Sequence, residues 1–157
     1  MAPLRQFLRG LGYDACGWGL GVNRTEPLES VARVGPALLE WADSAGQPVH
    51  LVGWSLGGVV ARELARVHPE AVGSVVTFGS PIIGGPIHTA AARHFDETAR
   101  ARILADIERA NRIRIRAPLT VIYSRRDGIV SWRACLDRLE PRAHHVEVRS
   151  THFGMGL

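Results

Sequence analysis

Gly53-Trp54-Ser55-Leu56-Gly57-Gly58 is the stretch that decides the fold of this 157-residue chain. It separates a short apolar run, residues 49–52, from a helical pattern over residues 59–67. A serine flanked by glycines two residues to either side, between a strand and a helix, is the nucleophile-elbow pattern. Ser55 is therefore the first candidate functional residue of the chain.

The two flanking glycines have a steric explanation. We expect side chains at Gly53 and Gly57 to collide with the neighbouring strand and helix, because the serine of such an elbow sits on a sharp, strained turn. The same turn is expected to lift the Ser55 hydroxyl clear of the sheet. It also directs the backbone amide of Leu56 toward the space that a reacting group would occupy.

Composition and charge indicate a single globular domain. The apolar fraction is 46%, and the length is sufficient for a sizeable core. The net charge is +4, and all 19 basic residues are arginine. The arginines are scattered and lack interleaved aromatic residues or a nucleic-acid-binding module, so we expect no nucleic-acid partner.

Several other functional classes lack support in the sequence. No apolar run reaches about 18 residues, so no transmembrane segment is predicted. The N-terminus has no signal-peptide core, which favours a cytoplasmic location. Cys16 and Cys135 are far apart and are interpreted as two buried free thiols. No histidine pair has metal-ligand spacing on one helix face, so no metal site is expected.

Strand-like and helical segments alternate along the chain. Strands are expected at 13–17, 49–52, 71–78, 119–123 and 145–149, and helices at 4–10, 28–45, 59–67, 96–112 and 132–139. Pro36 should kink or break the second helix. Alternation of short apolar strands with helices predicts a three-layer α/β/α domain with a mostly parallel sheet.

The segment at about 84–116 stands out as an insertion between two predicted strands. One interpretation is an ordinary amphipathic helix packed on the sheet. The other is a helical lid or cap over a binding site, where pocket-covering segments commonly lie. The residues themselves favour neither interpretation.

Partners for Ser55 follow in chain order. A serine hydroxyl needs a base to accept its proton and an acid to orient that base. Asp127 follows the strand at 119–123, and His152 follows the strand at 145–149. The carboxyl ends of parallel strands share one edge of a sheet, so both side chains are expected near Ser55. Asp127 also fits a simple turn, because Asp-Gly pairs favour turns.

Four segments together resemble the α/β-hydrolase-fold serine hydrolases, in particular their lipase-like and esterase-like members. The segments are Gly53–Gly58, Thr77-Phe78-Gly79-Ser80-Pro81, 123–130 and Ser150-Thr151-His152-Phe153-Gly154. The resemblance extends from about Leu4 to Gly154.

The resemblance implies roles for individual residues. Ser55 would be the nucleophile, His152 the general base and acid, Asp127 the orienting acid, and the Leu56 amide one oxyanion donor. Trp54 would pack beside the nucleophile. The implied reaction is hydrolysis of carboxylic esters, either small molecules or lipids, through an acyl-enzyme and without a cofactor.

The chain departs from the family pattern at its start. A second oxyanion donor normally comes from the loop after a central strand that precedes the first helix, and no segment of the sequence corresponds to that strand. The sequence also stops before the closing helix that the fold usually has. We therefore expect the chain to be a fragment at both ends, with a partner segment that fills the gap as the alternative. An acyltransferase would share every residue named above, and a non-catalytic domain could retain the elbow for packing. The oligomeric state is left open.

Overall fold

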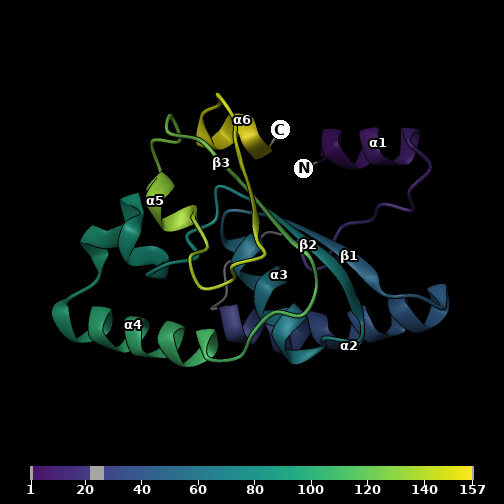
Figure 1. The fold of residues 1–157 in the computed structure, drawn as a ribbon, viewed down its shortest axis with the longest axis horizontal. Helices are drawn as coiled ribbons and strands as arrows, with labels where there is room; N and C mark the ends of the chain where they lie inside the picture. Colours follow the sequence, from purple (N-terminus) through teal and green to yellow (C-terminus); the bar gives the residue numbers. More distant parts are fainter. Residues whose placement is uncertain (1, 22–26, 157) are drawn as a thin grey trace.

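A parallel four-stranded sheet forms the centre of the computed structural model, which describes residues 2–21 and 27–156 (Figure 1). The strands follow the chain in the order β1-β2-β3-β4, and each pairs in parallel with the next. Their bounds are β1 (Val49–Trp54), β2 (Val72–Phe78), β3 (Leu119–Tyr123) and β4 (His144–Glu147). The predicted α/β class with a parallel sheet is confirmed.

The register of the sheet brings the carboxyl ends of the strands into line. Trp54 lies opposite Phe78, and Phe78 lies opposite Ile122. At the other side of β3, Tyr123 lies opposite Glu147. The segments that follow the four strands therefore start from one edge of the sheet, which is where ligands bind in open α/β sheets.

Helices account for most of the remaining chain (Figure 1). They are α1 (Ala2–Gly10), α2 (Pro27–Ala45), α3 (Leu56–Val67), α4 (Glu97–Asn111), α5 (Trp132–Cys135) and α6 (His152–Gly156), with two 3-10 turns, η1 (Gly85–His88) and η2 (Ala90–His94). Helix α3 packs on β1 and β2, and α2 packs against α3. None of the described helices has both the length and the apolar character needed to cross a membrane.

The apolar core lies between this helix pair and the sheet. Leu38 of α2, Val75 of β2 and Val121 of β3 have no measurable exposure, and Leu64 of α3 is 3% exposed. Burial of these apolar side chains is the main favourable contribution to folding. The core therefore fixes the helix that begins immediately after Ser55 against the strand that ends before it.

The predicted strand at 13–17 is wrong. These residues have no strand pairing, and Tyr13 is 59% exposed. Helix α1, which precedes them, has no buried residue. A strand is stable only when a neighbour satisfies its backbone groups, and among the described residues β1 pairs with β2 alone.

Two predicted helix boundaries also need correction. Helix α2 continues through Pro36, so of the two predicted outcomes, a kink or a break, the break is wrong. The helix expected over 132–139 ends at Cys135. Asp137 explains this early end, because its carboxylate accepts the backbone amides of Leu139 at 3.0 Å and Glu140 at 3.1 Å, which holds the chain in a turn.

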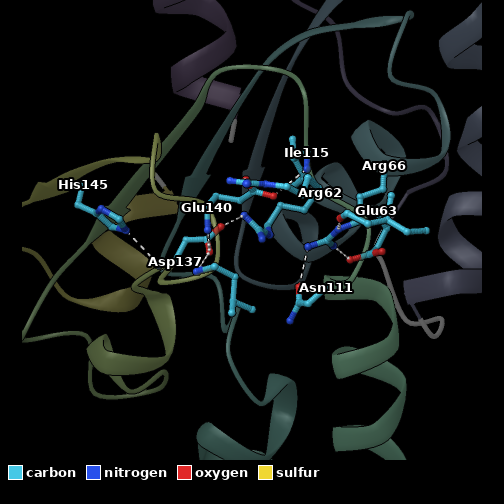
Figure 2. Close-up of polar contacts among 11 residues, drawn as sticks. Arg62, Glu63, Arg66, Asn111, Ile115, Asp137, Glu140 and His145 are labelled. Atoms are coloured by element: carbon cyan, nitrogen blue, oxygen red, sulfur yellow. Dashed lines mark hydrogen bonds and ion pairs between the residues drawn. The ribbon is translucent and has the colours of Figure 1, made fainter.

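A buried polar network joins α3 to the segments that follow α4 and α5 (Figure 2). Arg62 Nη1 lies 2.5 Å from Asp137 Oδ2, and both side chains are almost fully buried. Arg66 donates from Nη2 to Asn111 Oδ1 at 2.6 Å and from Nε to the Ile113 carbonyl at 2.9 Å. Helix α3, which begins directly after Ser55, is thus tied to the end of α4, to the residues after it and to the segment after α5 by charge-assisted hydrogen bonds.

Candidate active site

Ser55 occupies a strained turn between β1 and α3. Its φ of 55° and ψ of −124° make it the one non-glycine residue with positive φ in the part of the chain that the structure describes. The Ser55 amide donates to the Phe78 carbonyl at 2.8 Å. Strain of this kind persists only where the surrounding structure holds it, and it is concentrated at functional sites.

The glycines around Ser55 are explained only in part by the predicted collisions. A Cβ at Gly53 would overlap the backbone of Gly57 and Gly58, as expected. A Cβ at Gly57, in contrast, would meet no atom within 4 Å, so the collision predicted there is wrong. The second crowded position is Gly58, where a Cβ would overlap the Ser80 hydroxyl.

The Leu56 amide is the first N–H of α3. The first amides of a helix have no acceptor within the helix, and the helix dipole adds partial positive charge at this end. A negative charge that develops on an oxygen near Ser55 would therefore be stabilised by the Leu56 N–H as hydrogen-bond donor and by the field of the helix dipole.

Asp127 and His152 form a buried pair. His152 Nδ1 lies 2.8 Å from Asp127 Oδ2, and the side chains are 4% and 2% exposed. The other carboxylate oxygen, Oδ1, accepts the backbone amides of Ile129 at 2.9 Å and Val130 at 2.6 Å. With both oxygens occupied, the carboxylate is held in one orientation, and the imidazole nitrogen that remains free is Nε2.

The loops that carry these two residues are tied together by Ser124, which the sequence reasoning missed. Its hydroxyl donates to the Ser150 carbonyl at 2.6 Å and accepts the amides of Arg126 at 3.0 Å and Ser150 at 3.3 Å. A further backbone bond runs from the His152 amide to the Asp127 carbonyl at 3.0 Å. The position of Ser124 directly after a buried strand was the available signal.

Gly79, at the end of β2, leaves room for the buried pair. A Cβ at this residue would lie 2.8 Å from Asp127 Oδ2 and 3.1 Å from His152 Nδ1. Its φ of 52° is also in the region that favours glycine. Within the Thr77–Pro81 segment, Gly79 therefore leaves the space that the Asp127–His152 pair occupies.

Trp54, the residue directly before Ser55, contacts His152. The indole Nε1 donates to the His152 carbonyl at 3.0 Å, and the centroids of the two rings are 5.1 Å apart. Phe153 also packs near the indole, with ring centroids 6.0 Å apart. In the described part of the chain, hydrogen bonds link His152 to Asp127 but do not link Ser55 to His152.

The cysteines differ from one another. Cys135 is buried and Cys16 is exposed, so the prediction of two buried thiols is wrong for Cys16. Burial, followed by the charge of Asp127, raises the pKa of the Cys135 thiol to about 12.

Within residues 2–21 and 27–156, no cluster of three His, Cys, Asp or Glu side chains is arranged to hold a metal ion.

Comparison with known proteins gives one family and a consistent set of structures. Residues 4–153 match the alpha/beta hydrolase family. A 31-residue segment is 58% identical to the pimeloyl-[acyl-carrier protein] methyl ester esterase of Aeromonas hydrophila, a match that covers 20% of this chain and 12% of that protein.

Solved structures share the fold at low sequence identity. The mature Bacillus licheniformis lipase BlEst2 is 16% identical with a TM-score of 0.63, and the esterase domain of a Rhodothermus marinus protein is 24% identical with a TM-score of 0.60. The alignments cover 83% and 87% of this chain, and 69% and 63% of those chains. Because the family match includes almost all of the described residues, this chain belongs to the alpha/beta hydrolase family.

Proposed function

We propose that this protein is a serine hydrolase that cleaves carboxylic esters through a Ser55–His152–Asp127 triad and an acyl-enzyme. The observation that carries the proposal is the buried hydrogen bond between His152 and Asp127, at the sheet edge where the strained Ser55 also emerges. Family membership and a segment shared with a methyl ester esterase support the ester class.

In the proposed first step, His152 Nε2 accepts the proton of the Ser55 hydroxyl as Oγ attacks the carbonyl carbon of the ester. The negative charge on the carbonyl oxygen is stabilised by the Leu56 amide at the start of α3. Collapse of the tetrahedral intermediate breaks the bond to the alcohol oxygen, and His152 returns its proton to that alcohol.

In the second step, His152 accepts a proton from water as the water oxygen attacks the acyl carbon. Collapse of the second tetrahedral intermediate breaks the bond between the acyl carbon and Ser55 Oγ, the carboxylic acid leaves, and His152 returns its proton to Oγ. Asp127 keeps its charge throughout and stabilises the imidazolium that forms twice in the cycle. The Ser55–His152 hydrogen bond that this mechanism needs is expected to form in the substrate complex, because such contacts are often loose in free enzymes.

The direct test is covalent labelling together with ester hydrolysis. The protein should hydrolyse p-nitrophenyl acetate, and a fluorophosphonate should label Ser55, as mapped by mass spectrometry. Ser55→Ala should abolish both. Ser44→Ala, at an exposed serine of α2, is the matched control and should change neither. Labelling that persists in the Ser55→Ala variant, or a folded wild type that is not labelled, would refute the proposal.

We also propose that the segment at about 84–116 acts as a lid. In the structure it contains η1, η2 and α4, and α4 has no buried residue, whereas α3 has many. Helices with little burial open at low free-energy cost. Amide hydrogen exchange should therefore be faster in α4 than in α3, and a long-chain phosphonate on Ser55 should slow it. Unchanged exchange in α4 after labelling would exclude this role.

A further inference from the structure

A cavity of about 900 Å³ lies between α4, η1 and the segment that follows α5. This volume is within the range of small-molecule sites, about 300–1,000 Å³. Ser55, Asp127 and His152 do not line the cavity. It is therefore a separate feature of the molecule, to which the proposed ester hydrolysis assigns no role.

The interior of the cavity is largely apolar. Leu104 and Ile107 of α4 form one wall, and Ala134 and Leu139 contribute to the opposite side. Leu104 is 45% exposed and Leu139 is 48% exposed. Leucine surface that faces a cavity and remains open to water favours an apolar ligand, whose binding removes that surface from water.

The lining of the same cavity also includes three exposed arginines, here called the arginine rim. They are Arg112, Arg133 and Arg138, against a single carboxylate from Glu108. Within the described residues, none of these three arginines forms an ion pair with a carboxylate. Arg133 packs its guanidinium over the Trp132 ring, 4.4 Å from the centroid. Stacking of this kind occupies the face of the guanidinium, and its N–H edge is the part that binds carboxylates.

The buried polar network of Figure 2 holds two residues that line the cavity. Asn111, which lines the cavity, is bound by Arg66, and the backbone of Leu139 is bound by Asp137. Asp137 is itself buried and paired with Arg62. One side of the cavity is therefore formed before any ligand arrives, which lowers the free-energy cost of binding.

We propose that this cavity is a second binding site, separate from Ser55, for a fatty carboxylate. The alkyl chain lies against Leu104, Ile107 and Leu139, and the carboxylate binds at Arg112, Arg133 and Arg138. Apolar walls select the chain and the arginine rim selects the anionic head, so the two parts of one amphiphile match the two parts of the cavity.

The test is direct binding by isothermal titration calorimetry, with dodecanoate and dodecan-1-ol as probes below their micellar concentrations. Dodecanoate should bind wild type about tenfold more tightly than the alcohol, because only the carboxylate can pair with the arginines. The Arg112→Gln/Arg133→Gln/Arg138→Gln variant should lose this preference and retain binding of the alcohol. Retained alcohol binding also shows that the variant is folded with an intact cavity.

Two controls distinguish this site from others. Arg102→Gln/Arg109→Gln removes two arginines of α4 that do not line the cavity, and it should leave the preference unchanged. Labelling Ser55 with a diethyl phosphonate, which has no long chain to reach α4, should leave dodecanoate binding unchanged. The proposal is overturned if the triple variant keeps the preference, if the α4 control loses it, or if the phosphonate blocks binding. These readouts do not depend on ester hydrolysis, so the failure of one proposal does not imply failure of the other.

Discussion

His152 Nδ1 and Asp127 Oδ2 lie 2.8 Å apart in a part of the molecule that is almost closed to solvent. Two backbone amides, from Ile129 and Val130, hold the remaining carboxylate oxygen. In an imidazole that is bound through Nδ1 in this way, Nε2 is the nitrogen that can still accept a proton. This relationship between two residues 25 positions apart is the basis of the first prediction.

Asp127→Asn should reduce the rate of p-nitrophenyl ester hydrolysis by a factor on the order of 10⁴, as in other serine hydrolases. An asparagine amide in place of the carboxylate oxygen would favour the wrong imidazole tautomer. The measurement is kcat, accompanied by far-UV circular dichroism to confirm folding. A folded Asp127→Asn variant that retains most of its activity would contradict the role assigned to Asp127.

Gly53→Ala and Gly57→Ala form a matched pair that tests the steric description of the elbow. Gly53→Ala should lower the free energy of unfolding by about 3 kcal/mol, because its Cβ overlaps backbone atoms. Gly57→Ala should leave it unchanged or raise it by up to about 1 kcal/mol, because alanine favours a helix over glycine. Urea denaturation measures both, and equal destabilisation would show that the space beside Gly57 is filled.

Arg62→Met should lower the free energy of unfolding by about 3–5 kcal/mol. Removing one partner of a buried ion pair leaves Asp137 charged and without its counter-ion. The matched control is Arg114→Met, since the Arg114 side chain is 64% exposed where it pairs with Glu140. That change should cost less than about 1 kcal/mol. Similar losses of unfolding free energy in the two variants would show that burial does not decide how much each ion pair contributes to stability.

Iodoacetamide at pH 8 should modify Cys16 and leave Cys135 unmodified. The thiolate is the reactive form, and a pKa of about 12 keeps the Cys135 thiol protonated at this pH. Because the pKa is raised, reactivity of Cys135 should increase only as the pH approaches 12 or as the protein unfolds. Peptide mapping by mass spectrometry follows both sites, with urea-unfolded protein as the reference. Rapid modification of Cys135 in the folded protein would show that the thiol is accessible and ionised.

Patterns within short segments were sufficient for the main elements of the fold. The apolar run at 49–52, the glycines around Ser55 and the helical spacing after it predicted β1, the turn and α3 correctly. Asp127 and His152, which the structure brings to 2.8 Å of one another, were predicted to lie close together from their order along the chain and their position after strands. These features depend on backbone sterics and hydrophobic periodicity, which act between neighbours in sequence.

Contacts between distant segments decided the features of the fold and of the candidate site that the sequence did not predict. Gly58, rather than Gly57, is the crowded glycine because Ser80 comes from another strand end. Residues 13–17 did not form the predicted strand, because strand-like composition is insufficient without a paired neighbour. The helix after Trp132 ends early because Asp137 caps a turn and pairs with Arg62 of α3. Ser124 and the cavity beside α4 likewise depend on segments that only the tertiary structure brings together, since packing and hydrogen bonding act through space and not along the chain.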